Sequence, residues 1–253
     1  MNGRRREFVA EACGSFVLVF IGVGAVAMAV APDHPLGLGA VAACWGLGVA
    51  LGILVAAPAS EAHLNPAVTL AMAAIRRSDF PLGRIVLYLG SQLLGGLAAA
   101  AVLAVFTSGF VPSVEWLIEH PSTELTLWQF GLAEAVGTGL LMLVILKVSG
   151  RNSAVPAGLA PVVIGATVAA VIMVIGPMTA AALNPMRDLA PRLIATILHE
   201  GTAFSGEHGA WWIYLLAPTA GALLGALVHE LGLGEERTAK TENREQKTGT
   251  EAV

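Results

Sequence analysis

Apolar stretches without a charged side chain recur along the chain. Five of them contain no Asp, Glu, Lys or Arg: 12–32, 34–60, 85–114, 152–186 and 208–229. A sixth stretch, 125–146, is interrupted only by Glu134. A bilayer core needs about 20 apolar residues per helix, so the pattern predicts an all-α membrane protein with six transmembrane helices. These helices are expected near 6–31, 37–57, 82–106, 127–148, 157–175 and 210–232.

Composition supports this class and indicates an orientation. Apolar residues make up 56% of the chain and charged residues 13%, whereas soluble domains average about 25% charged residues. Most of the Lys and Arg lie in the two terminal segments and in the connections after the second and fourth spans. Because positive charges stay on the cytoplasmic side, we expect a multi-pass protein of the cell membrane with both termini in the cytoplasm. The polar tail 234–253 is expected to be disordered.

Two short segments fall outside the six spans and resemble each other. They are 63–77, which contains His-Leu-Asn-Pro, and 182–195, which contains Ala-Leu-Asn-Pro. A second pair of similar segments, AEACGSFVLVF with Glu11 and AEAVGTGLLML with Glu134, precedes them at similar spacing. The chain therefore contains two copies of one unit.

Each copy holds three spans, an odd number, so the second copy must enter the membrane from the opposite face. Inverted repeats of this kind are common in transport proteins. We expect a single domain over residues 1–233, with one repeat at about 6–106 and the other at about 127–232.

The Asn-Pro pairs predict helices that begin inside the membrane. Asparagine is a strong helix cap through its side-chain oxygen, and proline suits the first helical position. Pro58 and Gly176-Pro177 are expected to end the preceding spans. Non-helical backbone at this depth must be buried in protein or line a watery cavity. We therefore expect two half-helices that enter from opposite faces and meet near the midplane.

These motifs resemble a known family. SEAHLNPAVTLA and GPMTAAALNPMRDLAPR are similar to the two Asn-Pro-Ala loops of the major intrinsic proteins, the aquaporins and aquaglyceroporins, over residues 7–232. The resemblance implies six spans and two half-helices around a pore, and a homotetramer with one pore per subunit. The pore motif it implies comprises Asn65, Pro66, Ala67, Asn184, Pro185 and Met186.

The resemblance also implies a selectivity filter of Trp45, Ile172, Ala181 and Arg187. This set resembles the filters of glycerol facilitators and of plant nodulin-like intrinsic proteins. We expect Trp45 to offer a flat apolar wall, Ala181 to leave space opposite it, and Arg187 to bind hydroxyl groups. Loop support is expected from Glu11, Glu134 and His63.

The predicted function is a passive transmembrane channel for water and small neutral solutes such as glycerol, closed to protons and ions. Urea and arsenous acid are further candidate solutes. One alternative is a channel chiefly for undissociated metalloid acids such as arsenous or boric acid, and another is an ion-coupled secondary transporter. The scattered histidines have no metal-ligand spacing and no nucleophile–base pair is present. We therefore predict no enzyme activity, no cofactor, no metal and no nucleic-acid partner; the expected partners are the solutes, the lipid bilayer and further copies of the chain.

Several residues leave alternatives open. Met186 stands where the family has alanine, and it either narrows the pore or fills a gap. Glu61 stands where glycine is usual, near His63; that histidine is either a pH gate or, as we favour, a structural group that bonds loop carbonyls. Asp188 is expected to pair with a backbone or basic group such as Arg192.

Small residues suggest how the spans pack. Cys13 and Cys44 are expected to be buried thiols within the first two spans. Two glycine pairs at four-residue spacing, Gly48 with Gly52 and Gly221 with Gly225, permit close helix approach. The sequence leaves open whether these approaches lie within a subunit or between subunits.

Overall fold

The computed structural model describes residues 3–32, 35–111, 115–118, 121–150, 153–198, 202–205 and 210–233, and within them the regular secondary structure is helical. Six helices are long and apolar enough to cross a membrane. They contain α1 (Gly3–Ala29), α2 (Leu38–Ala56), α4 (Leu82–Thr107), α5 (Leu127–Ser149), α6 (Ala160–Thr179) and α8 (Ile213–Val228). The spans of α6 and α8 include an adjoining helical turn and run over Ala157–Thr179 and Ile213–Gly232. The predicted fold class is confirmed. The predicted disordered tail, 234–253, lies outside the described residues.

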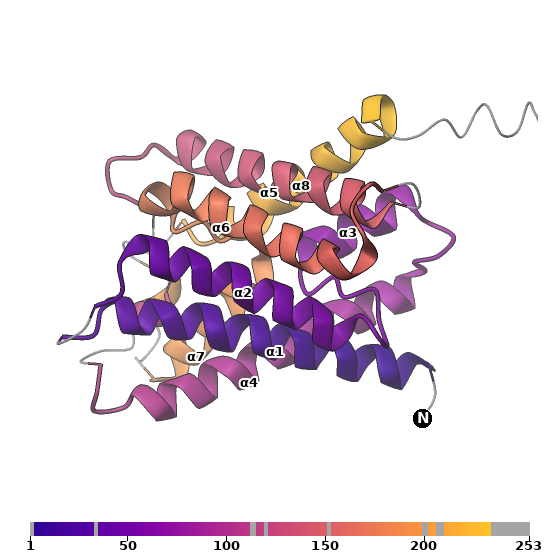
Figure 1. Ribbon diagram of the computed structural model, residues 1–253. Helices are drawn as coiled ribbons and strands as arrows, with labels where there is room; N and C mark the ends of the chain where they lie inside the picture. Colours follow the sequence, from indigo (N-terminus) through magenta and orange to yellow (C-terminus); the bar gives the residue numbers. More distant parts are fainter. Residues whose placement is uncertain are drawn as a thin grey trace, which may run out of the picture.

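Two shorter helices lie between the long ones: α3 (Pro66–Ile75) and α7 (Pro185–Leu198). At 1.5 Å per residue they are about 15 Å and about 21 Å long, so neither crosses a bilayer core. Figure 1 shows them at opposite ends of the bundle, α3 beside the end where the chain begins and α7 towards the other end. These are the two half-helices predicted from the Asn-Pro pairs.

One predicted helix end was wrong. Helix α6 continues through Pro177 to Thr179 instead of ending at Gly176-Pro177. A proline in the last turn removes a single backbone hydrogen bond, which a helix end tolerates. The helix stops where Ala180 adopts a left-handed conformation with φ of 62° and its N–H donates to the Gly176 carbonyl oxygen.

Glycines bring the long helices into close contact within this chain. A Cβ atom on Gly52 of α2 would lie 2.7 Å from the carbonyl oxygen of Gly14 on α1. On α8, a Cβ on Gly221 would collide with the Ala135 carbonyl and one on Gly225 with the Gly139 carbonyl, both on α5. The question left open by the sequence is therefore answered: these glycines serve contacts inside the subunit.

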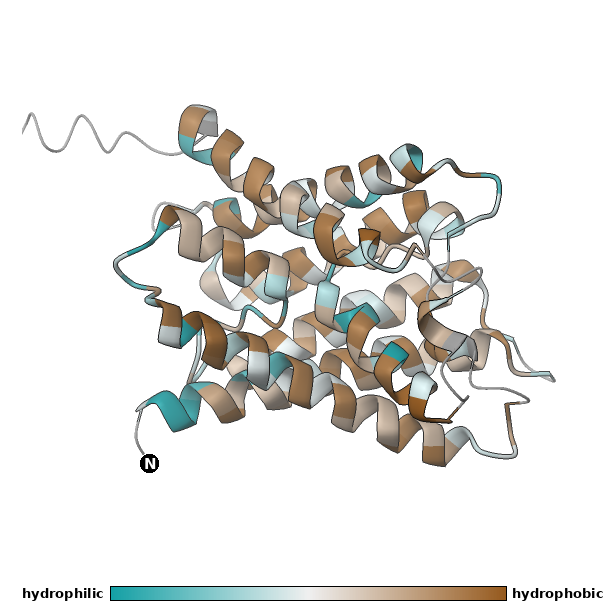
Figure 2. Cartoon of the chain, turned by 180° about the vertical axis from the view of Figure 1, so that it is seen from behind, coloured by the Kyte–Doolittle hydropathy of each residue, from teal (hydrophilic) through white to brown (hydrophobic). Residues whose placement is uncertain are grey.

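The outer surface of the bundle is apolar. Large side chains such as Val105, Val174 and Leu216 are more than half exposed on the long helices, and Figure 2 shows apolar residues along them, with polar ones at the start of α1. Cys13 also faces outward and Cys44 is half-buried, so the prediction of a buried thiol is wrong for Cys13. An outward apolar surface suits contact with lipid or with a neighbouring subunit.

Further short turns complete the described chain: η1 (Glu115–Leu117), η2 (Ala157–Leu159), η3 (Thr202–Phe204) and a π-helical turn, η5 (His229–Leu233), that extends α8. The end of α8 lies at the same end of the bundle as the start of α1 (Figure 1). An even number of crossings produces this arrangement.

Candidate functional site

The two half-helices begin against each other, and their asparagines hold the junction. Oδ1 of Asn65 accepts from the backbone N–H of Ala67 at 2.8 Å, so Asn65 caps α3, with Pro66 in the first helical position. Oδ1 of Asn184 accepts from the N–H groups of Met186, at 3.1 Å, and Arg187, at 3.4 Å. Each cap satisfies backbone donors that a helix start would otherwise leave unpaired.

The same asparagines also bond across the junction. Nδ2 of Asn65 donates to the carbonyl oxygen of Leu183 at 2.9 Å, and Nδ2 of Asn184 donates to that of Leu64 at 2.8 Å. Each amide group carries two hydrogens, so one is used across the junction and the second is available to the cavity that both residues line. The reciprocal bonds join two segments more than 100 residues apart in the sequence.

Both loops before the half-helices are strained in the same way. Ala62 and Leu64 have φ of 49° and 51°, and the corresponding Ala181 and Leu183 have φ of 51° and 55°. A left-handed conformation costs a non-glycine residue about 1–2 kcal/mol. In this conformation the loops turn their carbonyl oxygens and amide groups in directions that an ordinary helix start does not allow.

Two buried carboxylates hold the strained loops. Glu134 on α5 accepts from the N–H groups of Ala182 and Leu183, at 3.0 and 2.9 Å, and from the Thr179 hydroxyl at 2.6 Å. Glu11 on α1 accepts from the N–H groups of His63 and Leu64 at 3.0 and 2.9 Å.

Glu11 has two further donors, the Ser60 hydroxyl and the Gln92 amide, each at 2.8 Å. Both glutamates are fully buried. Their hydrogen bonds compensate the loss of water around the charge, and they fix the loops from behind.

A cavity of about 250 Å³ passes the junction of the two loops. One part of its wall is formed by the loops and their asparagines. Much of the remainder is aliphatic, contributed by side chains of the long helices: Leu18, Val49, Ile53, Leu141, Ile145, Ile164 and Val168. The cavity therefore has a polar strip along an apolar channel.

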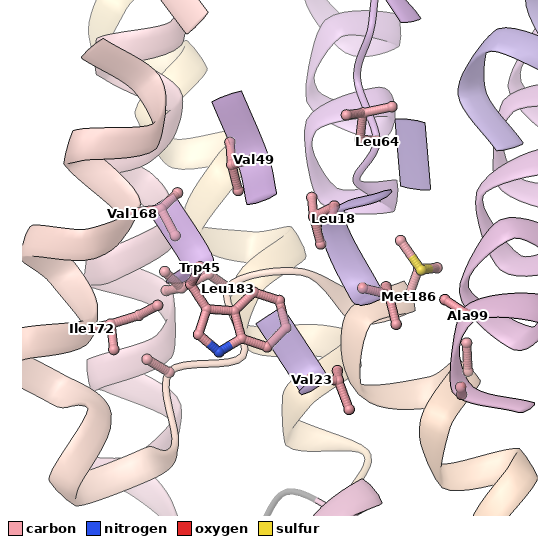
Figure 3. Packing of buried hydrophobic residues seen from close by; sticks show 14 of the residues in the cluster. Leu18, Val23, Trp45, Val49, Leu64, Ala99, Val168, Ile172, Leu183 and Met186 are labelled. Atoms are coloured by element: carbon pink, nitrogen blue, oxygen red, sulfur yellow. The ribbon is translucent and has the colours of Figure 1, made fainter. Parts of the chain in front are cut away.

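The four predicted filter residues all line this cavity. The guanidinium carbon of Arg187 lies 4.2 Å from the centre of the Trp45 ring, and its Nη2 donates to the Ala180 carbonyl oxygen at 3.1 Å. Ile172 and Ala181 lie in the same wall, and Figure 3 shows Ile172 next to Trp45. We name this part of the cavity the filter end.

The stacking of Arg187 on Trp45 was not expected from the sequence, which suggested a bare tryptophan wall. A guanidinium group over an aromatic face gains a cation–π attraction, worth about 2 kcal/mol when water is excluded. The contact fixes the direction in which the arginine donors point, and it leaves Ile172 and Ala181 to supply apolar surface.

The other residues of the pore motif lie outside the cavity wall. Ala67 is fully buried in a cluster with residues of α5 and α8. Met186 is 1% exposed, and a Cβ atom on Gly96 of α4 would lie 2.5 Å from its sulfur. Figure 3 shows Met186 beside Ala99 and apart from Trp45. Of the two alternatives for Met186, the structure supports gap filling between α7 and α4.

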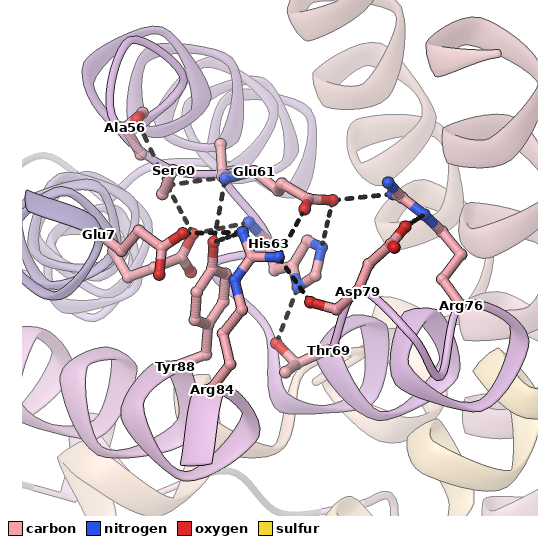
Figure 4. A network of polar contacts seen from close by, with 12 residues as sticks. Glu7, Ala56, Ser60, Glu61, His63, Thr69, Arg76, Asp79, Arg84 and Tyr88 are labelled. Carbon is pink, nitrogen blue, oxygen red and sulfur yellow. Dashed lines mark hydrogen bonds and ion pairs between the residues drawn. The ribbon is translucent and has the colours of Figure 1, made fainter. Parts of the chain in front are cut away.

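Polar groups crowd the opposite end of the cavity, which we name the N-terminal mouth because it lies beside the start of α1. Glu61 lines the cavity there and pairs with Nη1 of Arg76 at 2.8 Å and Nη1 of Arg84 at 3.1 Å. Arg84 also pairs with Glu7 of α1 at 2.8 Å. Figure 4 shows this network around His63. It joins α1, the loop before α3 and the start of α4.

The partner predicted for His63 was wrong. Its Nδ1 contacts the hydroxyl of Thr69 at 3.2 Å, not a loop carbonyl. The ring is stacked on Phe80 at 5.0 Å and lies 5.1 Å from Tyr88. Arg84 and Tyr88 were not singled out from the sequence; the signal available was their i, i+4 spacing at the charged start of a span.

Asp188 and Arg192 pair within α7, as predicted. Nε of Arg192 donates to Asp188 at 3.0 Å, and Nη1 donates to the Ala203 carbonyl oxygen at 2.7 Å. Both side chains are buried, so the charge of Arg192 is matched where lipid or protein would otherwise surround it.

Six apolar spans, two half-helices capped at a central junction and a cavity along that junction define a membrane channel. The described residues contain no group of three or more His, Cys, Asp or Glu side chains that could hold a metal ion. Comparison with known families gives the same class, because the family model described as major intrinsic protein matches residues 2–229. The chain belongs to the major intrinsic protein family, whose members are channels, not enzymes.

Individual relatives agree over most of their length. The chain is 32% identical to Aquaporin NIP1-1 of Oryza sativa subsp. japonica over 226 residues, covering 89% of this chain and 74% of that protein. It is 32% identical to the Glycerol uptake facilitator protein of Haemophilus influenzae over 247 residues, covering 89% and 93%. The X-ray structure of the aquaglyceroporin from Plasmodium falciparum superposes with a TM-score of 0.85 at 29% identity, covering 91% of this chain and 97% of that one.

Proposed function

We propose that this chain is a passive channel for water and small neutral polyols such as glycerol. The observation that carries the proposal is the cavity at the junction, whose wall contains both loop asparagines, Trp45, Ile172, Ala181 and Arg187. The relatives named above as a glycerol uptake facilitator and an aquaglyceroporin support it.

The cavity suits a molecule with a carbon backbone and several hydroxyl groups. Hydroxyl groups can exchange hydrogen bonds with Arg187, with the asparagine amides and with the loops, while carbon atoms contact the aliphatic wall. At the filter end Ala181 projects only a methyl group, which leaves room for a solute wider than water. Urea and arsenous acid are neutral, small and rich in polar hydrogens, and we propose them as further solutes.

Charge placement supports the exclusion of cations. The half-helices direct the positive ends of their dipoles at the junction, and Arg187 adds a full positive charge at the filter end. A cation would lose its water shell against these positive groups. A water molecule that accepts from both asparagine amides points its own hydrogens away from the junction, which interrupts a proton relay.

The alternative of an ion-coupled transporter is disfavoured by the state of the buried carboxylates. Such a transporter needs ionisable groups that exchange an ion or proton near the midplane. Glu11 and Glu134 are instead occupied by loop N–H groups and hydroxyls. Their contacts suit a fixed structural role.

We further propose that the N-terminal mouth faces the cytoplasm, because Arg4, Arg5 and Arg6 begin α1 there and basic residues stay on that side. Both termini then lie in the cytoplasm of a multi-pass membrane protein. The exposed apolar surface supports a lipid-embedded assembly, and a homotetramer with one pore per subunit is the assembly we propose.

Stopped-flow light scattering on vesicles containing the purified protein tests the proposed solutes. Water, glycerol, urea and arsenous acid are compared in wild-type protein and in Ala181→Phe. A phenyl group at the filter end fills space needed by the larger molecules, so we expect glycerol and arsenous acid permeability to fall about tenfold or more and water permeability to fall less.

The matched control is Val174→Phe, which adds the same ring to the exposed side of α6 and should leave every permeability within about twofold of wild type. An equal loss for all four solutes in Ala181→Phe would count against the filter assignment. A wild-type channel that carries arsenous acid but little glycerol would favour the metalloid alternative.

A further inference from the structure

Two hydrogen-bond acceptors face each other at the N-terminal mouth. Oε2 of Glu61 lies 3.8 Å from Nε2 of His63 (Figure 4), which is longer than a hydrogen bond. Both residues line the cavity. The side chain of Glu61 is 28% exposed and that of His63 is 4% exposed, so the carboxylate is the outer of the two groups.

The hydrogen bonds behind His63 determine which ring nitrogen carries the proton. Thr69 has a single hydroxyl hydrogen, which it donates to the Asn65 carbonyl oxygen at 3.0 Å. The hydroxyl oxygen of Thr69 itself accepts from Nε2 of Gln92 at 3.0 Å. Its 3.2 Å contact with Nδ1 of His63 therefore requires Nδ1 to donate. A neutral His63 then presents Nε2 as an acceptor.

Neither of the facing acceptors finds a donor in the other. Nε2 of His63 has no hydrogen-bond partner among the residues that the structure describes. Glu61 pairs with Arg76 at 2.8 Å and with Arg84 at 3.1 Å, and these two positive groups favour its ionised form. The carboxylate is therefore ionised, and a carboxylate accepts hydrogen bonds without donating. A ligand that brings two donors can bond to Nε2 of His63 and to the Glu61 carboxylate, whose oxygens have further lone pairs besides those that Arg76 and Arg84 use.

We propose that Glu61 and His63 form a solute-binding station at the N-terminal mouth, which takes neighbouring hydroxyl groups of a neutral polyol. One hydroxyl donates to Nε2 of His63 and the next donates to the Glu61 carboxylate. Arg187 supplies donors at the filter end, so the cavity has a donor end and an acceptor end, and a polyol hydroxyl can use both.

This station rests on the proposed polyol channel but is separable from it. A binding site near one mouth lowers the glycerol concentration at which the flux saturates, because glycerol occupies that site at high concentration. Such a site has little effect on glycerol permeability at low concentration. That permeability is set by the highest free-energy barriers along the pore, above all the barrier at the filter end. Loss of the station should therefore raise the half-saturating concentration and the maximal flux together.

The test uses vesicles in which the full chain is inserted in one orientation. Glycerol flux is measured against concentration from the N-terminal side and from the opposite side, with water permeability alongside. In Glu61→Gln the new amide group can donate to Nε2 of His63, so the protein satisfies that acceptor itself. Asp79→Asn is the control, because Asp79 pairs with Arg76 in the same network but does not line the cavity.

We expect Glu61→Gln to raise the half-saturating glycerol concentration on the N-terminal side about tenfold, the effect of losing one hydrogen bond to a charged group. Water permeability and low-concentration glycerol permeability should stay within about twofold of wild type. Asp79→Asn should match wild type in every measurement.

The proposed station would be refuted by any of three results. These are an unchanged half-saturating concentration in Glu61→Gln, an equal change in Asp79→Asn, or a parallel fall of glycerol and water permeability. In that last case Glu61 would only be holding the mouth in shape. Nitrogen-15 NMR of labelled histidine gives an independent readout: glycerol should shift the Nε2 resonance of His63, assigned with His63→Asn. Finding both ring nitrogens protonated at pH 7 would also overturn it. A wild-type channel with no glycerol flux at all would instead refute the proposed function.

Discussion

Single side chains at the junction each make contacts in two directions. Asn65 caps its own half-helix through oxygen and bonds the opposite loop through nitrogen, and Asn184 does the same in reverse. An aspartate in either position keeps the cap but loses the donor, and a leucine loses both. The amide group is therefore required at these positions by its combination of one acceptor and two donors.

Met186→Ala should weaken the fold without altering selectivity. The side chain is 1% exposed and packs against α4 at Gly96, so truncation leaves a cavity and should cost about 2–5 kcal/mol of stability. Thermal unfolding in detergent measures the loss, and vesicle flux should keep the wild-type ratio of glycerol to water permeability. Higher glycerol flux from a protein of unchanged stability would mean that Met186 narrows the pore after all.

Glu61 gives the N-terminal mouth a measurable pH dependence. The pKa of Glu61 lies at about 2, below the ordinary value of 4.5, since burial is outweighed by His63, Arg76 and Arg84. Its ion pairs therefore stabilise the fold above about pH 4.5 and are lost as the pH falls towards 2. We expect a contribution of about 1 kcal/mol, because solvent screens a side chain that is 28% exposed.

Thermal unfolding of wild type and Glu61→Gln between pH 7 and pH 2.5 checks this. The wild type should be the more stable protein at pH 7, and the difference should shrink as the pH falls below 4.5. A difference that stays constant down to pH 2.5 would show that the carboxylate charge contributes nothing.

At the scale of elements, a half-helix works only together with the loop that precedes it. Helix α3 has 10 residues and α7 has 14, and isolated helices of that length are marginal. Each is fixed by its asparagine cap, by its packing and by a preceding loop that donates hydrogen bonds to a buried glutamate. Among the residues that the structure describes, the left-handed non-glycine residues lie in these two loops.

Glu134→Gln should release the second loop. An amide in place of the carboxylate turns an N–H₂ group towards the donors of Thr179, Ala182 or Leu183, and leaving one buried donor unpaired costs about 1–3 kcal/mol. We expect lower thermal stability together with a loss of both water and glycerol flux. Thr138→Val, one turn further along α5 and also buried, is the control and should keep most of the flux. Full activity in Glu134→Gln would show that the loop holds its shape without the carboxylate.

At the scale of the whole molecule, the buried charged side chains of the helices pair with an opposite charge, accept hydrogen bonds from loop N–H groups or line the cavity. Asp188 and Arg192 neutralise each other inside α7, whereas Arg187 contacts Trp45 at the filter end. The two half-helix dipoles and this arginine make the centre and the filter end positive. The molecule can therefore carry neutral solutes while opposing cations.

Wild-type vesicles should be tight to protons while they shrink rapidly in an osmotic test. Arg187→Val removes the full positive charge from the filter end, and we expect proton and sodium leak to rise at least several-fold with glycerol flux retained. A pH-sensitive dye inside the vesicles reports the proton leak, and empty vesicles give the background. Free proton flow through the wild-type channel would contradict the proposed exclusion mechanism.

Much of the architecture could be predicted from local patterns. Uncharged stretches of sufficient length indicated the six spans, and the Asn-Pro pairs indicated the two half-helices, because capping and proline geometry act within a few residues. The end of α6 was missed because proline is tolerated in a last turn. The outward side chain of Cys13 was missed because an apolar span has no polar face to reveal which side is buried.

The four predicted filter residues could be named through the resemblance to the major intrinsic proteins, but their contacts could not be predicted. Whether Arg187 stacks on Trp45, or Met186 turns towards α4, depends on side-chain directions on helices that are distant in sequence. The same holds for the ion pairs that bring Arg84 to Glu7 and Glu61. No local pattern encodes these distances.

The sequence by itself determined that this protein crosses a membrane six times and starts two helices within it. Those features follow from the free-energy cost of placing a charged side chain or an unpaired backbone group in hydrocarbon. That cost depends on each residue and its near neighbours in the sequence. The tertiary structure alone decided that Asn65 reaches Leu183, that Asn184 reaches Leu64, and that a carboxylate and an imidazole face each other at one mouth. Such contacts arise when the two halves of the chain pack together, so their geometry exists only in the assembled fold.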